Sequence, residues 1–111
     1  MAVLLNGSSA SASEILASAL QESGRASIVG EKSAGIANAA NLDALPDGGG
    51  LSITSVQTLT PVQRRSLDGQ GVLPDSGIAV SDEDIPLGRD RQLDGAVALV
   101  SSAAGTGAAR P

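Results

Sequence analysis

Asn6-Gly-Ser-Ser-Ala-Ser-Ala-Ser-Glu14 joins a short apolar run to a helical pattern and so sets the order of the first elements of the fold. Residues 3–5, Val-Leu-Leu, precede it and are typical of a strand buried on both faces. The asparagine and glycine that follow supply turn chemistry. From Ser11 onward, apolar residues recur at helical spacing. The pattern therefore predicts a strand, a turn and a helix that begins near Ser11.

The helical pattern has a clear end and leads to a second strand. Its apolar positions are Ile15, Leu16, Ala19 and Leu20. Gly24 suits the left-handed position that ends many helices. Residues 26–30 then predict another strand, so residues 2–30 form a compact strand–helix–strand unit with parallel strands. This pattern indicates an α/β fold.

A serine at the start of this helix has two interpretations. Unpaired N–H groups and the positive end of the helix dipole converge there, which suits a developing oxyanion beside a serine nucleophile. Ser11-Ala-Ser-Glu14 also satisfies the capping box, in which the serine and glutamate side chains bond reciprocally to backbone N–H groups. The residues alone leave both interpretations open.

The order of motifs resembles the C-terminal processing peptidases, also called tail-specific proteases. The residues that carry the resemblance are the run from Asn6 to Glu14, Ile15 to Ala26, Val29-Gly-Glu-Lys32, Leu45-Pro-Asp-Gly48, Leu51 to Pro61, Gly69-Gln-Gly-Val72 with Pro74-Asp75, and Gln92-Leu93 before Ala96 to Val100. The likeness spans about residues 3–100. It implies part of a ClpP/crotonase-like fold, with a parallel strand–helix–strand unit, a β-hairpin and a C-terminal helix.

The resemblance also implies roles for individual residues. Ser11 occupies the position of the family's nucleophile, and Ala12 that of the residue whose backbone N–H helps to form the oxyanion hole. Glu14 matches a family glutamate. The implied function is a serine endopeptidase that cleaves polypeptide substrates through an acyl-enzyme.

One departure from the family pattern bears directly on activity. The family's usual base is a lysine 25 residues after the nucleophile, and Ile36 stands at that position. A serine hydroxyl is a poor nucleophile without a base, and the chain contains no histidine. Three explanations remain open: a base in a segment that precedes these residues, Lys32 reaching across, or a catalytically inactive domain that binds peptides or assembles with itself. We expect the 111 residues alone to be inactive.

Composition excludes several other classes of function. The net charge is −5 and no aromatic side chain is present, which argues against nucleic-acid binding. Without cysteine or histidine a zinc site is not expected, and we predict neither a metal nor a cofactor. Gly48 to Gly50 precede a strand pattern and lack the P-loop lysine, so they indicate a turn. No stretch approaches the ~20 apolar residues of a membrane span, so membrane insertion is not expected.

The second half of the chain predicts looser structure. Residues 42–45 and 51–59 flank a glycine-rich turn and predict a hairpin. Arg64 and Arg65 indicate a solvated face, with the alternative that one of them pairs with a substrate carboxylate. Residues 78–80 suggest a short strand, and Asp82 to Asp84 a solvated acidic loop that lacks the ligand spacing of an EF-hand.

A last helix is predicted over residues 90–101, with Leu93, Ala96, Val97 and Val100 on one face and Gly95 as a weak point. We interpret residues 1–101 as a partial catalytic domain and residues 102–111 as a disordered tail. The chain is then the C-terminal part of a longer protein, which the family resemblance places in the cell envelope or another extracytoplasmic compartment. An uncovered sheet edge predicts self-association into a homo-oligomer.

Overall fold

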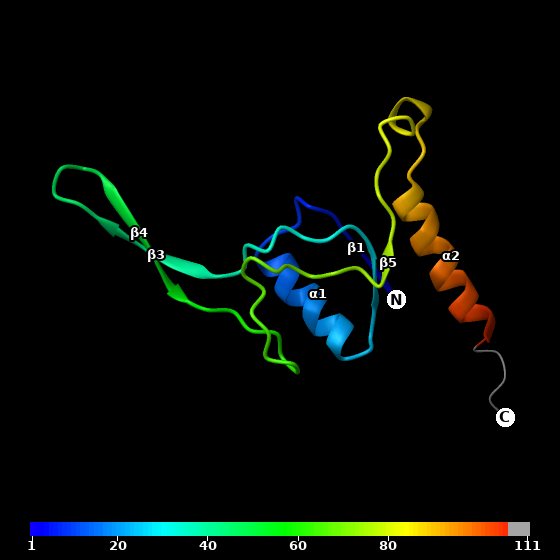
Figure 1. Ribbon diagram of the computed structural model, residues 1–111, viewed down its shortest axis with the longest axis horizontal. Helices are drawn as coiled ribbons and strands as arrows, with labels where there is room; N and C mark the ends of the chain where they lie inside the picture. The colour runs from blue at the N-terminus through cyan, green and yellow to red at the C-terminus, as the bar shows by residue number, and fades with distance from the viewer. Residues whose placement is uncertain (107–111) are drawn as a thin grey trace.

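The computed structural model describes residues 1–106 and shows a small α/β unit that carries a long hairpin (Figure 1). In chain order its elements are β1 (Ala2–Leu5), α1 (Ala12–Glu22), β2 (Ser27–Gly30), β3 (Ala39–Ala44), β4 (Gly50–Val56), β5 (Ser76–Gly77), the 3-10 helix η1 (Ile85–Leu87) and α2 (Arg91–Thr106).

The predicted strand–helix–strand unit is confirmed. Strands β1 and β2 pair in parallel, with Ala2 opposite Ser27 and Leu5 opposite Gly30. The chain later returns to add β5 in parallel on the other side of β2, giving the order β1-β2-β5. Strand β2 therefore lies between two neighbours, and this explains why it is the most buried strand of the described sheet.

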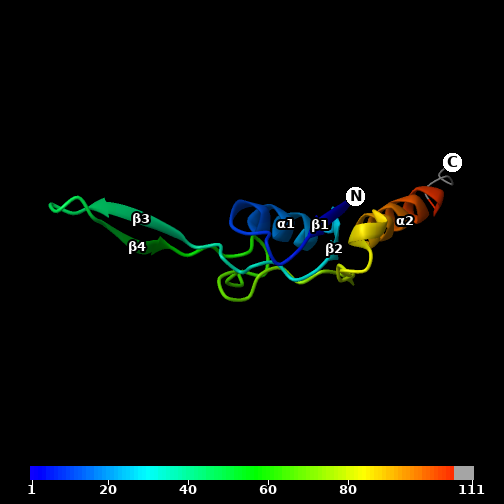
Figure 2. The same cartoon turned by 90° about the horizontal axis from the view of Figure 1, so that it is seen from above.

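The two helices cover opposite faces of β1 and β2. Successive strand residues point to opposite sides of a sheet. Leu5 accordingly belongs to the buried cluster beneath α1, whereas Leu4 lines an apolar groove against α2. Figure 2 shows this arrangement from above, with α1 over the middle of the molecule and α2 at the end opposite the hairpin.

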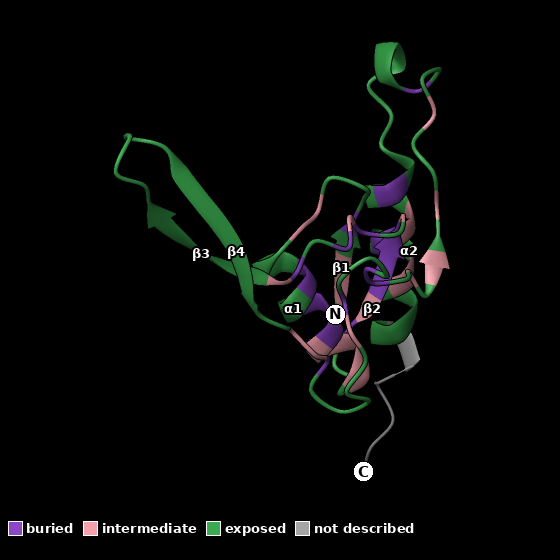
Figure 3. Cartoon of the chain, turned by 60° about the vertical axis from the view of Figure 1, so that its left-hand side comes forward, coloured by how far each residue is buried: buried purple, intermediate pink, exposed green. Residues whose placement is uncertain are grey.

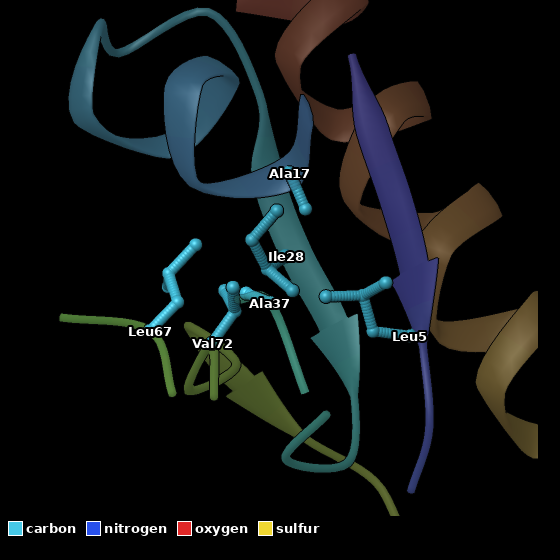
Figure 4. Close-up of a cluster of buried hydrophobic side chains, with 6 residues drawn as sticks. All are labelled: Leu5, Ala17, Ile28, Ala37, Leu67 and Val72. Atoms are coloured by element: carbon cyan, nitrogen blue, oxygen red, sulfur yellow. The ribbon is translucent and has the colours of Figure 1, made fainter. Parts of the chain in front are cut away.

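The core lies between α1, β2 and the loops that follow them (Figure 4). Its members are aliphatic and mostly small: Leu5, Ala17, Ile28, Ala37, Leu67 and Val72. Because no aromatic residue is available, few large side chains fill this space. The buried side of α1 includes polar groups as well, since Glu14 and Ser18 are buried, whereas Leu16 is 62% exposed.

Residues 39–56 form a hairpin that projects from this body, and we call it the arm. Strands β3 and β4 pair antiparallel around a turn at residues 45–49, as predicted. Strand β3 begins at Ala39 and β4 ends at Val56, in each case three residues earlier than expected. Every residue of the two strands is exposed, as Figure 3 shows. The arm therefore contributes length to the molecule but no core.

Two other predictions for the second half were wrong in detail. Residues 78–80 form no strand, because the pairing with β2 is made by Ser76 and Gly77. Asp84 is not solvated: it is 3% exposed and is paired with Arg91 of α2. Gly95, predicted as a weak point of the last helix, also packs closely against Ile78, because a Cβ there would lie 2.3 Å from Cδ1 of Ile78.

Helix α2 begins at Arg91, as predicted to within one residue, and continues to Thr106. The first part of the expected tail is thus helical, and residues 107–111 lie outside the described residues. Of the four residues predicted on one face of this helix, Ala96 is buried, whereas Leu93, Val97 and Val100 are partly exposed along the groove beside β1.

Candidate active site

The turn between β1 and α1 presents Ser11 in an unusual backbone conformation. Ser11 has φ 59° and ψ −121° and is one of two non-glycine residues with positive φ in residues 1–106. Such conformations cost of order 1–3 kcal/mol and persist only where the surroundings impose them. Sharp turns of this kind, between a strand and a helix, present nucleophiles in other hydrolases. Ser11 is exposed, so a substrate can reach its hydroxyl.

The predicted capping box is present in arrangement, but its glutamate makes the stronger contribution. Ser11 N–H donates to Glu14 Oε2 at 3.0 Å. Ser11 makes no side-chain cap hydrogen bond, although it and Glu14 are disposed as a capping box requires. The N–H of Glu14 donates to the Ser11 carbonyl oxygen at 2.9 Å. The Glu14 carboxylate therefore holds the start of the helix more firmly than the Ser11 hydroxyl does.

Glu14 is a fully buried carboxylate surrounded by hydrogen-bond donors. Its Oε1 accepts from Ser33 Oγ at 2.5 Å and from Gly35 N–H at 2.7 Å. Its Oε2 accepts from Ile36 N–H at 2.9 Å as well as from Ser11 N–H. Burial raises the pKa of the Glu14 carboxyl, but these four hydrogen bonds outweigh burial and hold the pKa below its ordinary value. Glu14 is thus stabilised as an anion, with no cation needed beside it.

The same contacts bring Ile36 next to Ser11. The N–H of Ile36 donates to Glu14, and the carbonyl oxygen of Ile36 accepts from Ser11 N–H at 2.8 Å. The turn before α1 is also joined to the turn of residues 33–36, because Ala34 N–H donates to Ser9 O at 2.9 Å. The Ile36 side chain is 63% exposed. The position predicted for the base therefore adjoins the predicted nucleophile, and it carries a hydrocarbon side chain.

Lys32 makes no contact that links it to Ser11. Its side chain is exposed, and none of the hydrogen bonds or ion pairs within residues 1–106 involves its ammonium group. The structure therefore brings Ser11, Glu14 and Ile36 together but does not join Lys32 to them.

The start of α1 leaves a backbone donor free for an oxyanion. In residues 1–106 the N–H of Ala12 donates to no other group. Ala12 follows Ser11 directly and opens the helix, where unpaired N–H groups and the dipole favour negative charge. Ala12 is the residue for which the family resemblance implies a role in the oxyanion hole.

Polar side chains of Gln21, Asp75 and Gln92 connect the helices to the segment around β5. The Gln21 amide donates to Leu73 O at 3.0 Å and to Asp75 Oδ1 at 2.9 Å, and Asp75 Oδ2 accepts from Ile28 N–H at 2.7 Å. The amide of Gln92 donates to Ile78 O at 2.8 Å. These contacts tie both helices to the segment around β5.

Arg65 lies near Glu22, with its guanidinium 3.8 Å from a Glu22 carboxylate oxygen. Glu22 also accepts from Val62 N–H at 2.8 Å. Burial raises the pKa of the Glu22 carboxyl, but hydrogen bonds and the charge of Arg65 lower it below its ordinary value. Arg65 thus anchors a loop, whereas Arg64 forms no ion pair within residues 1–106.

Sequence reasoning missed one residue of the site, Ser33. Its hydroxyl joins Glu14 to the backbone of Val72, although the two lie far apart in the sequence. The available signal was a small polar residue beside Gly35, but a serine in a turn has too many ordinary roles to stand out.

No group of three or more histidine, cysteine, aspartate or glutamate residues within the described part of the chain could hold a metal ion. Among residues 1–106, no helix combines the length and apolarity required to cross a membrane.

Comparison with known proteins identifies the family of the chain. The model of peptidase family S41 matches residues 1–78. A carboxyl-terminal-processing protease of Picosynechococcus sp. is 45% identical over 75 residues, covering 68% of this chain and 18% of that protein. The protein of the same name from Synechocystis sp. is 38% identical over 104 residues, covering 91% of this chain and 24% of that protein. The chain therefore spans about a fifth of the length of these relatives.

Solved structures show the same relationship. The photosystem II D1 C-terminal processing protease superposes with a TM-score of 0.64 and 37% identity, covering 70% of this chain and 20% of that chain. A putative peptidase from Parabacteroides merdae superposes with a TM-score of 0.75 and 26% identity, covering 88% of this chain and 30% of that chain. With the family match over residues 1–78, these similarities lead to one conclusion: this chain belongs to peptidase family S41.

Proposed function

We propose that this chain forms the nucleophile-bearing part of a serine endopeptidase and that Ser11 is the nucleophile. The observation that carries the proposal is the Ser11 backbone at φ 59° and ψ −121°, held by Glu14 and Ile36 at the start of α1. A serine that served only as a helix cap would not need this backbone conformation.

The proposed reaction is acyl transfer to water. Ser11 Oγ attacks the carbonyl carbon of a peptide bond while a base takes the hydroxyl proton. The Ala12 N–H donates to the oxyanion of the tetrahedral intermediate. The C–N bond then breaks, the leaving amine receives the proton, and water hydrolyses the acyl-enzyme to regenerate Ser11. Glu14 acts through the backbone of Ser11 and is a positioning residue.

The base is the part of this reaction that the chain does not supply. The chain has no histidine, and Ile36 cannot accept a proton. In this proposal the proton acceptor comes from a residue outside these 111 residues, and the segment alone is inactive. The second candidate is a non-catalytic domain that binds peptides at the same place, and it is favoured by the hydrocarbon side chain of Ile36 beside Ser11.

Substrates and compartment follow from the relatives and belong to the proposal. Several relatives are named for carboxyl-terminal processing, and some of these names include the word chloroplastic. We propose unfolded or extended polypeptides as substrates and an extracytoplasmic compartment for the parent protein. We also propose that the segment self-associates through an uncovered sheet edge, since β1 lies at the edge of its sheet.

A fluorophosphonate reagent tests the proposed nucleophile, because it modifies a serine that a base and an oxyanion hole activate. The full-length protein is treated with the reagent and the modified peptide is identified by mass spectrometry, with Ser11→Ala as the control. Labelling at Ser11 supports the endopeptidase. A folded protein without labelling would favour the peptide-binding domain.

A further inference from the structure

Ser33 is buried between two parts of the chain that are far apart in the sequence. Its side chain is 4% exposed. The Ser33 hydroxyl donates to Glu14 Oε1 at 2.5 Å and accepts from Val72 N–H at 2.7 Å. One small hydroxyl therefore supplies a donor to a carboxylate and an acceptor to a backbone amide. Alanine could do neither, whereas threonine retains the group that does both.

The segment on the far side of Ser33 is Leu67–Val72, which we call the bracing loop. Its backbone packs directly on the turn of residues 33–36. Ser33 N–H donates to Val72 O at 3.1 Å, and Gly69 N–H donates to Gly35 O at 2.8 Å. A Cβ at Gly71, which has φ 65°, would lie 2.7 Å from the Ser33 carbonyl oxygen. The bracing loop and the turn therefore cannot shift independently.

On its near side, Ser33 reaches Ser11 through a single carboxylate. Glu14 accepts from Ser33 with Oε1 and from Ser11 N–H with Oε2. It also accepts from Ile36 N–H, so the same carboxylate holds the position beside Ser11. A continuous path of hydrogen bonds thus runs from Val72 N–H through Ser33 and Glu14 to Ser11 N–H.

We propose that Ser33 is a positioning residue that couples the bracing loop to the backbone of Ser11 through Glu14. This inference rests on the proposed function of Ser11 for its catalytic meaning. The hydrogen bonds themselves do not depend on that function. A displacement of the bracing loop, by substitution or by a partner that binds it, would then change the geometry of the nucleophile.

The test is a pH titration of the chain followed by backbone amide NMR. The amides of Ser11, Gly35 and Ile36 donate to Glu14, so their shifts report its ionisation. Val72 N–H reaches Glu14 only through Ser33, so the proposal predicts that its shift changes with the same midpoint. A Val72 amide that does not respond at this midpoint would overturn the proposal, and this measurement needs no variant.

Substitution of Ser33 sharpens the test. Ser33→Ala removes a hydrogen bond that lowers the pKa of Glu14, so the midpoint that the Ser11, Gly35 and Ile36 amides report should move to higher pH. The Val72 amide should no longer respond at that midpoint, because its link to Glu14 is lost. Amide hydrogen exchange at Ser11 and Ile36 should become about tenfold faster, because a hydrogen bond to a charged group is lost. Ser33→Thr should keep the wild-type midpoint and exchange rates. An unchanged midpoint in Ser33→Ala, or a midpoint in Ser33→Thr that matches Ser33→Ala, would contradict the proposed coupling.

Failure of this inference can be told apart from failure of the proposed function. If the Val72 amide shift does not share the pH midpoint of the other amides, the coupling through Ser33 is refuted, but the proposed nucleophile is not tested. If the midpoint is shared but Ser11 is not labelled by the fluorophosphonate, the proposed nucleophile is refuted and the coupling through Ser33 is supported.

Discussion

The region around Glu14 and the arm differ in how their residues are stabilised: the first by contacts between distant segments, the second only by local hydrogen bonds. Around Glu14, one buried carboxylate gathers four hydrogen bonds from two separate turns. In the arm, each residue of β3 and β4 is exposed and the strands bond only to each other in the described structure. Figure 3 makes the contrast visible, because the buried residues lie in the body and the arm is exposed throughout.

Tertiary contacts constrain the body of the molecule much more than they constrain the arm. In the body, contacts between distant residues fix the backbone closely enough to hold Ser11 at a positive φ. The arm satisfies its own local hydrogen bonds and buries little apolar surface, and a hairpin of this kind is marginally stable in water. Substitutions should therefore have large effects in the body and small effects in the arm.

The largest expected difference comes from placing the same side chain at a glycine in each region. At Gly30, with φ 119°, a Cβ would lie 2.2 Å from the carbonyl oxygen of Leu5, which is backbone and cannot turn away. Gly30→Ala should lower the free energy of unfolding by about 3 kcal/mol or more. At Gly48, with φ 85° and open space around it, the cost should be about 1 kcal/mol. Urea denaturation of both variants measures the difference, and equal effects would refute the contrast.

Acid should weaken the body before it weakens the arm. Glu14 has a lowered pKa in the folded chain, so its contribution to stability is complete above about pH 4.3, the ordinary value of an unfolded glutamate. That contribution is lost as the pH falls from there through the folded pKa. Thermal unfolding measured across this range should show the loss in the wild type. Glu14→Gln should be less stable at neutral pH and show a smaller loss; an identical pH dependence would contradict this role of Glu14.

The smallest effect is expected in the arm. Leu42 is 77% exposed, so Leu42→Ser should change the free energy of unfolding by less than about 0.5 kcal/mol.

Self-association is the property more sensitive to uncovered edges and exposed apolar side chains. Light scattering of the wild-type chain should show association that grows with concentration. A monomer at high concentration would rule out the proposed homo-oligomer.

Local patterns in the sequence predicted the fold well where each element was specified by its own residues. The apolar run before Asn6, the start of α1 and the glycine-rich turn of the arm each carry such a signal. Strand β5 has only two residues, and its partner lies far away in the sequence, so its position could not be found from local pattern. Asp84 looked solvated because its partner Arg91 follows on a separate element.

Three residues of the predicted site, Ser11, Glu14 and Ile36, lie together in the structure, but Ser33 and the contacts that join the two turns could not be found from the sequence. The Ser11-to-Glu14 run indicated both a nucleophile and a cap, and the arrangement contains features of each. That Glu14 also bonds to Ser33, Gly35 and Ile36 depends on tertiary contacts between two turns. No spacing rule in the sequence encodes those contacts.

The most direct test of Ser11 as the nucleophile is to place an amine beside it in this chain. Ile36 is exposed and contacts Ser11 through its backbone, so Ile36→Lys should fold normally. The variant is treated with a fluorophosphonate beside the wild type, with Ile36→Met to match the side-chain length and with Ser11→Ala added to Ile36→Lys as the negative control. The account predicts labelling at Ser11 in Ile36→Lys only. A folded Ile36→Lys chain that is not labelled would contradict the claim that Ser11 is a prearranged nucleophile that lacks only its base.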